Sequence, residues 1–412
     1  MLTSSDIIEE LSNLNPPTTE FNNKLMLKAL LLLGNPQNNY KVIHIAGSNG
    51  KGSTAAFLEE ALYQTGLKIG KFSSPHVNKI NECISYNKNL IDDQTLIRIY
   101  LELKLTLNNH NIYPSSFEML TLIMFKFFAE KNIDYLILET GMGGQDDSTN
   151  VVNSSYSIIT NISLEHTQWL GNTLDEIARH KCGIIKNGLT ILGENIPELV
   201  NHTREKTSNF VLIDDLYNYT VELNFKNFST ILKFDDKYNN HFNFELGLFG
   251  YFQARNFLCA YTVLNDIGIS IDTIQKAAKK TSWAGRLQKI SNYPLTILDA
   301  SHNESGTGAL TACLSNYGKR QNSIILCSIL KDKNIDKMLE DYSKISEDII
   351  FCSIANQARA SNPFSLARKA RYKFKNIYVI PSPSLALYQA RKMKKQLILI
   401  SGSIYLLKNF IH

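Results

Sequence analysis

The chain has 412 residues, of which 44% are hydrophobic and 20% are charged, so one simple core is excluded and two or three packed units are expected. Its net charge of +5 favours nucleic acid no more than any other anionic ligand. The six scattered cysteines contain no CxxC pair, which excludes a disulfide framework or a cysteine metal site and favours a reducing cytoplasm.

The start of the chain has no basic-then-apolar leader, and the longest apolar candidate, near Leu30 to Leu33, is far shorter than a membrane span. We therefore expect a protein that is neither exported nor attached to a membrane.

Short apolar runs alternate with longer amphipathic segments between residues 41 and 192. The runs predicted to be strands are Lys41–Ala46, Lys68–Phe72, Tyr135–Glu139, Ser157–Ile162 and Leu189–Leu192. Apolar residues at helical spacing predict helices over 115–131 and 173–185. The alternation predicts an α/β fold with a doubly wound parallel sheet. Strand-like alternation between 219 and 249 predicts a small antiparallel addition.

The pattern repeats in the second half of the chain. Helices are expected over 253–266 and 272–280, and the strands expected after them are Thr296–Asp299, Ile324–Cys327, Ile349–Cys352, Ile377–Ile380 and Leu397–Ile400. These strands predict a second, Rossmann-like α/β domain. The expected division is a first domain over 1–282, a hinge over 283–286 and a second domain over 287–412.

A glycine-rich turn, residues 47–54 (GSNGKGST), follows the first predicted strand. Glycines allow positive φ angles, so that N–H groups and the N-terminus of the next helix can point at an anion. Lys51 adds a mobile positive charge. Ser53, expected as the first helical residue, is placed to hold the magnesium of a nucleotide triphosphate. Only two residues, rather than the usual four, separate Gly47 from the Gly50-Lys51 pair. The alternative interpretation of this segment is an ordinary strand-to-helix turn.

Polar residues also follow three other predicted strands. Ser74, Glu139 and His166 are expected to converge beside the glycine-rich turn, because ligands collect beyond the carboxyl ends of parallel strands. A hydroxyl, a carboxylate and an imidazole in an oxygen-rich site suit Mg²⁺. Taken singly, their alternative roles are a turn cap, an ion-paired carboxylate and an interior histidine.

Four further residues carry charge at informative places. Lys181 lies in a helix with one buried face, where a lysine must lose its charge, find a partner or be modified; the alternative is a solvated lysine. Arg286 lies at the predicted hinge and could bridge charge between the domains. Asp299 and His302 follow a strand and could orient phosphate or ribose, although a turn rich in Asp, Ser and Asn is also typical of any strand exit.

Together, these segments resemble the folylpolyglutamate synthase and dihydrofolate synthase family, within the Mur ligase group of ATP-dependent amide-forming enzymes. The resemblance spans most of the chain and rests on order and spacing. The matching segments are 34–37 (GNPQ), 47–54 (GSNGKGST), 74–76 (SPH), 117–118 (FE), 139–144 (ETGMGG), 147–150 (DSTN), 166–171 (HTQWLG), 181–184 (KCGI), 253–256 (QARN), 285–286 (GR), 299–303 (DASHN), 331–333 (KDK) and 402–403 (GS).

The resemblance implies a first domain of the Mur ligase central-domain type and a C-terminal glutamate-ligase domain. It implies a bifunctional enzyme that uses ATP to phosphorylate the carboxylate of dihydropteroate or a reduced folate, and then joins L-glutamate through its amine. The site must then supply positive charge and alignment rather than a protein nucleophile. The expected partners are these small molecules, without nucleic acid or membrane, and the expected state is a monomer.

The resemblance also assigns roles to residues. Those implied in ATP binding are Gly47, Asn49, Gly50, Lys51, Gly52, Ser53, Thr54, Asn256, Arg286, Asp299 and His302. Two Mg²⁺ sites are implied at Ser53, Ser74, Glu139 and His166, the catalytic group comprises Lys51, Glu139, His166 and Lys181, and the pterin contacts are Phe117, Asp147 and Ser148. Lys181 matches a lysine that is carbamylated in the family, and a monovalent cation is a further implied cofactor. Glutamate is assigned to His302 and Ser403.

The sequence departs from the family pattern at Gln145 and Asp146, where arginine and leucine are common, and this removes a positive charge near the expected metal and pterin region. Ser48, Ser148, Glu165 and Ser301 replace threonine, alanine, aspartate and glycine. The alternatives to a bifunctional enzyme are a folylpolyglutamate synthase with one activity, a ligase of cell-wall precursors and a non-catalytic nucleotide-binding protein. The polar segment 13–23 is expected to cover a pterin.

Overall fold

The computed structural model describes residues 3–14, 22–355 and 357–411, and the chain forms two compact units. The first unit contains the described residues up to 218, together with 234–242 and 255–280. The second contains 219–233, 243–254 and the described residues from 281 onward. In the described part of the chain, no helix has the length and apolar character needed to cross a bilayer.

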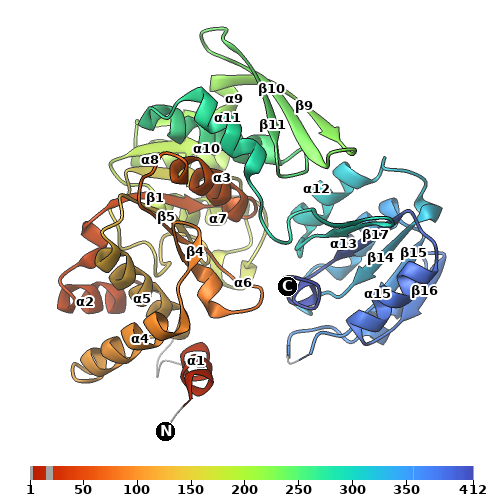
Figure 1. The fold of residues 1–412 in the computed structure, drawn as a ribbon, viewed down its shortest axis with the longest axis horizontal. Helices are drawn as coiled ribbons and strands as arrows, with labels where there is room; N and C mark the ends of the chain where they lie inside the picture. The colour runs from red at the N-terminus through yellow and green to blue at the C-terminus, as the bar shows by residue number, and fades with distance from the viewer. Residues whose placement is uncertain (1–2, 15–21, 356, 412) are drawn as a thin grey trace. The chain divides into compact units, whose positions relative to one another are not determined.

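An eight-stranded sheet forms the centre of the first unit, in the order β4-β3-β2-β5-β1-β6-β7-β8. Its strands β1, β4 and β5 are labelled in Figure 1. The six strands from β2 to β8 in that order are parallel, and β3 and β4 extend the sheet as an antiparallel hairpin. The strands are β1 (Lys41–Ala46), β2 (Ile69–Phe72), β3 (Ile84–Tyr86), β4 (Asn89–Leu90), β5 (Tyr135–Glu139), β6 (Tyr156–Ile159), β7 (Leu189–Leu192) and β8 (Phe210–Leu212).

Helices cover both faces of this sheet. They are α1 (Ser4–Ser12), α2 (Lys24–Leu32), α3 (Lys51–Tyr63), α4 (Asp93–Asn108), α5 (Ser116–Lys131), α6 (Thr167–Leu170), α7 (Leu174–Lys181), α8 (Pro197–Lys206), α9 (Ile213–Leu216), α10 (Gln253–Ile267) and α11 (Ile271–Lys280), with 3-10 turns over Pro36–Asn38, Ile80–Cys83 and Cys182–Ile184. Ser115 and Thr173 begin α5 and α7 with reciprocal capping boxes, which satisfy backbone N–H groups of the first turn.

Val42, His44 and Ala46 are alternate residues of β1, so their side chains point to the same face of the sheet, as the pleat requires. Val42 belongs to a hydrophobic cluster with α1, α2, α4 and α5, and Ala46 belongs to a second cluster with α6, α7 and α8. His44 lies between them in the strand and is fully buried. A polar side chain therefore stands in the middle of an apolar layer.

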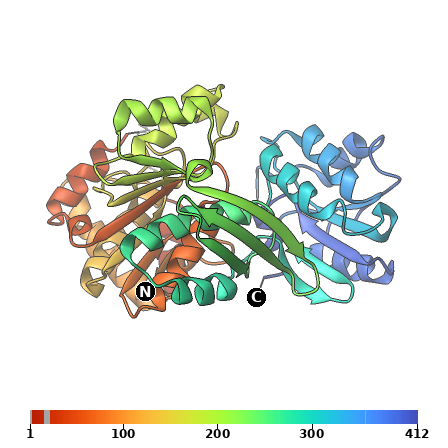
Figure 2. The ribbon, with the colours of Figure 1, turned by 90° about the horizontal axis from the view of Figure 1, so that it is seen from above.

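Three strands form a separate small sheet in the order β11-β10-β9, and they lie side by side in Figure 2, in green. They are β9 (Tyr217–Asn224), β10 (Ser229–Asp236) and β11 (His241–Leu246). A turn in which Asp236 N donates to Asn240 O at 3.2 Å joins the last two strands. This is the small added sheet that the alternation between 219 and 249 predicts.

The second unit has a six-stranded sheet in the order β12-β13-β17-β14-β15-β16, parallel except for the antiparallel β12–β13 pair. One face carries a cluster with α12, α13 and α14, and the other a cluster with α15 and α16. The elements are β12 (Gln288–Asn292), β13 (Leu295–Leu298), α12 (Glu304–Leu314), the 3-10 turn Arg320–Asn322, β14 (Ser323–Cys327), α13 (Ile335–Ile345), β15 (Asp348–Phe351), α14 (Pro363–Ala370), β16 (Asn376–Val379), α15 (Pro383–Lys392), β17 (Leu397–Ser401) and α16 (Ile404–Leu407).

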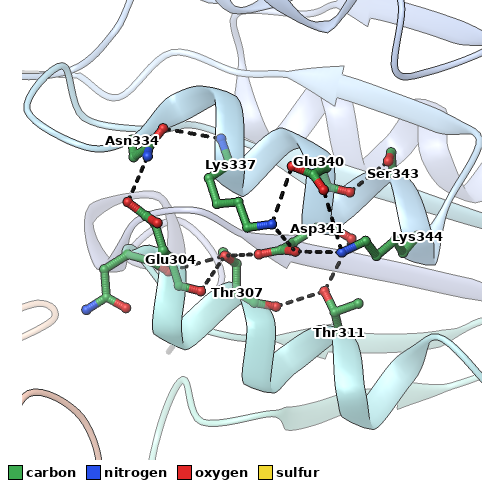
Figure 3. A network of polar contacts seen from close by, with 10 residues as sticks. Glu304, Thr307, Thr311, Asn334, Lys337, Glu340, Asp341, Ser343 and Lys344 are labelled. Carbon is green, nitrogen blue, oxygen red and sulfur yellow. Dashed lines mark hydrogen bonds and ion pairs between the residues drawn. The ribbon is translucent and has the colours of Figure 1, made fainter. Parts of the chain in front are cut away.

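Helices α12 and α13 are joined by a polar network around buried Asp341 (Figure 3). Thr307 Oγ1 donates to Asp341 Oδ2 at 3.1 Å, and Lys344 Nζ donates to Asp341 Oδ1 at the same distance. The buried carboxylate is thus both hydrogen-bonded and ion-paired. This network fixes the helix that begins immediately after the polar turn at 299–303.

Most predicted elements have ends within one residue of the observed ones, but two of them end more than two residues away. The strand predicted to reach Ile162 ends at Ile159, because Thr160 and Asn161 turn aside to bond the glycine-rich loop. The helix predicted to reach Ile185 ends at Lys181 and continues as a 3-10 turn. Ser53 is the third residue of α3 rather than the first.

Candidate functional site

The glycine-rich segment 47–54 lies at the junction of β1 and α3: residues 47–50 form the loop between the two elements, and residues 51–54 are the first residues of α3. Gly50, with φ at 85°, precedes the first helical residue, and because it has no side chain it leaves the first N–H groups of α3 free to face an anion. A Cβ atom at Gly50 would lie 2.2 Å from Asn256 Oδ1, and one at Gly47 would lie 1.8 Å from Thr160 Oγ1. Lys51 Nζ donates to Gly47 O at 2.7 Å. The backbone is therefore packed so closely that only glycine fits.

Residues that follow β6 brace this loop. Asn161 Oδ1 accepts from Asn49 N at 2.8 Å, and Thr160 Oγ1 donates to Asn49 O at 2.6 Å. Ser48 Oγ accepts from Ser163 N at 2.9 Å. Because both backbone groups of Asn49 are held in this way, the shape of the loop is set before any ligand arrives.

Two of the predicted nucleotide residues, Thr54 and Asn256, pack against each other. Thr54 is fully buried, and its hydroxyl donates to Asn256 O at 3.3 Å. Asn256, in α10, is 6% exposed and closes over Gly50. The contacts of Thr54 are those of a residue that fixes α3 to α10.

The three polar residues predicted at strand ends lie along one edge of the sheet. Ser74 follows β2, Glu139 ends β5 and His166 lies beyond β6, while the glycine-rich loop follows β1. In the sheet order β2-β5-β1-β6 these are consecutive positions, and parallel strands bring their carboxyl ends to the same edge. Glu139 and Ser53 are buried, whereas His166 is exposed and has a left-handed φ of 48°.

The donor types at this edge fit magnesium. Serine hydroxyls and one carboxylate are hard oxygen donors, and Mg²⁺ in nucleotide sites takes one or two carboxylates, with water and phosphate completing its shell. Among the described residues, no three or more His, Cys, Asp or Glu side chains form a cluster that could hold a metal ion. A zinc-type cage of protein side chains is absent from that part of the chain.

Lys181 at the end of α7 is buried and ion-paired. Its side chain is 1% exposed, and Lys181 Nζ donates to Glu165 Oε1 at 2.8 Å. Burial lowers the pKa of Lys181, although the Glu165 charge opposes that shift. Burial alone would raise the pKa of Glu165, but the charges of Lys181 and Lys51 hold it at about 2. The solvated-lysine alternative is thus wrong, and Glu165 belongs to the same charged group as Lys51.

The predicted pterin residues Phe117 and Asp147 meet at Gly141, in the loop after β5. A Cβ atom at Gly141 would lie 2.5 Å from the Phe117 ring and 3.2 Å from Asp147 Oδ2. Burial raises the pKa of Asp147, whose carboxylate accepts from Met142 N at 2.7 Å. Ser148 is half-buried beside it. The loop therefore brings an aromatic ring and a carboxylate together.

Gln145, the departure from the family pattern, is exposed but is held through its backbone. Gln145 N donates to His180 O at 2.7 Å, and Gln145 O accepts from Asn150 Nδ2 at 2.9 Å and from Asn23 Nδ2 at 3.1 Å. Most of the segment 13–23, predicted to cover a pterin, lies outside the described residues at 15–21. Asp146 Oδ2 lies 3.6 Å from His180 Nδ1.

The second unit places its predicted residues at the carboxyl ends of β13 and β17, which are neighbours in the sheet. Asp299 is buried, which raises its pKa although the charge of Arg286 opposes the shift. Asp299 Oδ2 accepts from Leu287 N at 2.9 Å. His302 Nδ1 donates to Ala300 O at 3.0 Å. Ser403 is buried and caps α16 by accepting from Tyr405 N at 3.3 Å.

Three residues with central positions were not among the predicted site residues: Glu165, His44 and Thr149. Glu165 precedes predicted His166, and its partner is 16 positions away in sequence. His44 Nε2 lies 2.9 Å from Thr149 Oγ1, deep in the sheet. The available signal for His44 was a polar residue inside an otherwise apolar strand of six residues.

Comparisons with known proteins find the same family of similar proteins over nearly the whole chain. Residues 45–264 match the family model of the Mur ligase middle domain, and residues 285–404 match that of the Mur ligase glutamate ligase domain. The chain is 30% identical over 401 residues to the dihydrofolate synthase/folylpolyglutamate synthase of Bacillus subtilis, covering 93% of both chains. It is 32% identical over 353 residues to the dihydrofolate synthetase of Saccharomyces cerevisiae, covering 80% of both. Its fold is similar to that of E. coli FolC in complex with DHPP and ADP, with a TM-score of 0.89, 25% identity and coverage of 98% and 96%.

Proposed function

This chain belongs to the dihydrofolate synthase/folylpolyglutamate synthase family of Mur ligases, and from that premise we propose that it joins L-glutamate to dihydropteroate and to reduced folates at the expense of ATP. The observation that carries the proposal is the convergence, at one sheet edge, of a preformed phosphate loop with the buried Lys181–Glu165 pair. A protein that only binds nucleotide has no need of such a charged group, which the fold must stabilise against desolvation.

The chemistry required is the activation of one acid and its capture by an amine. The N–H groups at the start of α3 and the Lys51 ammonium hold the β- and γ-phosphates, so that the terminal phosphoryl group faces the acceptor carboxylate. The carboxylate attacks phosphorus, ADP leaves, and the acyl phosphate is attacked by the glutamate amine with loss of inorganic phosphate. Because two anions must approach each other, alignment and positive charge supply most of the acceleration.

Magnesium would be held by Ser53, Ser74, Glu139 and His166 at two sites, and it supplies charge neutralisation on the phosphates. Lys181 is proposed to be carbamylated. Its depressed pKa increases the share of neutral amine, the form that adds to carbon dioxide. A monovalent cation is the remaining proposed cofactor.

Acceptor and nucleotide contacts complete the proposal. Phe117, Asp147 and Ser148 would receive the pterin, while Asn256 would contact the nucleotide. From the second unit we assign Arg286, Asp299 and His302 to ATP, and His302 with Ser403 to glutamate. The domains proposed are 1–282 and 287–412, separated by a hinge at 283–286.

A monomer in a reducing cytoplasm is the proposed state of the enzyme. All six cysteines are buried and unpaired, which supports a compartment that keeps thiols reduced. Light scattering of the purified chain tests the monomer directly.

The decisive experiment measures glutamate-dependent ADP release with three acceptors: dihydropteroate, a reduced folate and a nucleotide-sugar peptide of the cell-wall type. Release with the first two and not with the third is expected. Release with the reduced folate alone would reduce the proposal to a folylpolyglutamate synthase, and release with none would overturn it.

Lys181→Ala tests the role of the buried lysine. Ligation should be abolished and partly restored by added short carboxylic acids, which replace the missing carbamate oxygens. Lys206→Ala removes an exposed lysine at the end of α8; it is the control variant and should retain full activity. Unchanged activity of Lys181→Ala would remove this residue from the mechanism.

A further inference from the structure

His44 is buried at a place where the strand pattern calls for an apolar residue. It is 0% exposed, and its neighbours on the same face of β1, Val42 and Ala46, both belong to hydrophobic clusters. An imidazole without partners is costly to bury. A histidine at this position therefore needs a specific hydrogen bond, and the partner in that bond indicates which part of the structure the histidine stabilises.

The hydrogen bond leads to the acceptor loop. His44 Nε2 lies 2.9 Å from Thr149 Oγ1, and Thr149 Oγ1 donates to Asp147 Oδ1 at 2.5 Å. Both carboxylate oxygens of Asp147 also accept backbone N–H groups, from Thr149 at 3.0 Å and from Met142 at 2.7 Å. Three donors, the Thr149 hydroxyl and the two backbone N–H groups, are therefore arranged around the Asp147 carboxylate.

The direction of each proton follows from this arrangement. Thr149 has one hydroxyl proton, which it gives to Asp147, so its oxygen accepts from His44 Nε2–H. His44 Nδ1 is then unprotonated, and it has no hydrogen-bond partner among the described residues. Burial, and secondarily the charge of Lys186, lower the pKa of His44 to about 3. The imidazole is a fixed neutral donor throughout the neutral pH range.

We propose that His44, acting through Thr149, is a positioning residue for the acceptor substrate: it holds the Asp147 carboxylate and the loop at 141–144 in the orientation that receives the pterin ring beside Phe117. The inference rests on the proposed function, because that function assigns the pterin to Asp147 and Phe117. It adds two residues that only the fold brings together, since 105 positions separate His44 from Thr149.

The same chain of bonds ties the acceptor loop to the strand that carries the phosphate loop. His44 lies three residues before Gly47, and Asp147 binds the loop that follows Glu139 on the adjacent strand β5. A rigid link between these loops keeps the two reactants at a constant separation within the first unit.

Thr149→Val tests the inference, because it preserves shape and removes the hydroxyl. The KM for dihydropteroate should rise about tenfold or more, the size expected when a hydrogen bond to a charged group is lost, while the KM for ATP stays within about twofold. Thr149→Ser restores the hydroxyl and should restore the KM. Thr190→Val is the matched control: Thr190 is also fully buried in this sheet, but its hydroxyl has no partner in the described part of the chain, so both KM values should be unchanged.

A second pair of variants keeps the test decisive if Thr149→Val does not fold. His44→Leu removes the donor and should raise the KM for dihydropteroate, whereas His44→Gln places an amide N–H near the position of Nε2 and should recover most of it. Parallel rises in both KM values, or no rise, would reduce His44 to a satisfied core histidine and overturn the inference. A wild-type enzyme that uses neither dihydropteroate nor folate would instead overturn the proposed function, and the inference with it.

Discussion

Replacing His44 by glutamine is predicted to make the protein less sensitive to acid. The pKa of His44 is lowered in the folded protein from 6.5 to about 3, chiefly by burial. Between pH 6.5 and pH 3 the His44 side chain is protonated in the unfolded chain and neutral in the folded chain. The contribution of His44 to stability is therefore complete above pH 6.5 and is lost as the pH falls toward 3.

The magnitude follows from the width of this window. Each pH unit below 6.5 costs about 1.4 kcal/mol of unfolding free energy, so acidification to pH 5 removes about 2 kcal/mol through this one side chain. Glutamine has no titrating group, so the His44→Gln variant does not lose this part of the unfolding free energy on acidification. The difference in unfolding free energy between wild type and His44→Gln should therefore shift by about 2 kcal/mol in favour of the variant between pH 7 and pH 5.

The assay is denaturant unfolding of both proteins at pH 7, 6 and 5, compared at each pH so that all other titrating groups cancel. Lys186→Met provides a second arm. Its lost charge removes the smaller cause of the shift, so acid sensitivity should decrease slightly but persist. Parallel stability curves for wild type and His44→Gln would show that His44 accepts a proton in the folded state, and the assignment of a fixed neutral donor would be refuted.

Three further substitutions have calculable outcomes. Gly50→Ala would place a Cβ atom 2.2 Å from Asn256 Oδ1 at a φ of 85°, so nucleotide affinity measured by calorimetry should fall at least tenfold, and wild-type affinity would contradict the close packing of the loop. Lys71→Met leaves the buried Glu59 carboxylate without its ion-pair partner and should lower the free energy of unfolding, measured with denaturant, by about 3–5 kcal/mol. Adding Glu59→Leu should recover most of that loss. Equal losses in the single and the double variant would exclude the ion pair as the cause. Thr173→Ala removes the cap of α7 and should destabilise the protein by about 1 kcal/mol, detectable as a lower melting temperature, whereas Thr173→Ser should not.

The central strands could be predicted from sequence because they are buried on both faces. Lys41–Ala46 and Tyr135–Glu139 are mostly apolar runs of strand length, and the structure has both with the predicted ends. The strands that were not predicted, β3, β4, β8 and β12, are short, polar or at sheet edges. Edge strands are half solvated, so their sequences resemble loops.

The candidate site could be predicted only where its residues form local motifs. Gly50 and Lys51 are adjacent, and Glu139 directly ends a strand, so spacing alone identified them. His44 and Thr149 lie on different elements, and their contact depends on a loop closing over the sheet. The strand pattern predicts Lys41–Ala46 as a strand, but it contains no information about the hydrogen bond between His44 and Thr149.

The buried Lys181–Glu165 pair also couples two of the proposed events at the site, carbamylation and metal binding. As an ammonium, Lys181 attracts Glu165 across 2.8 Å. Carbamylation would replace that positive charge by a negative one, and two carboxylates this close repel strongly in a site shielded from water. The modified lysine is therefore stable only if a cation enters between the two groups, so the proposed carbamylation and the proposed binding of magnesium must favour each other.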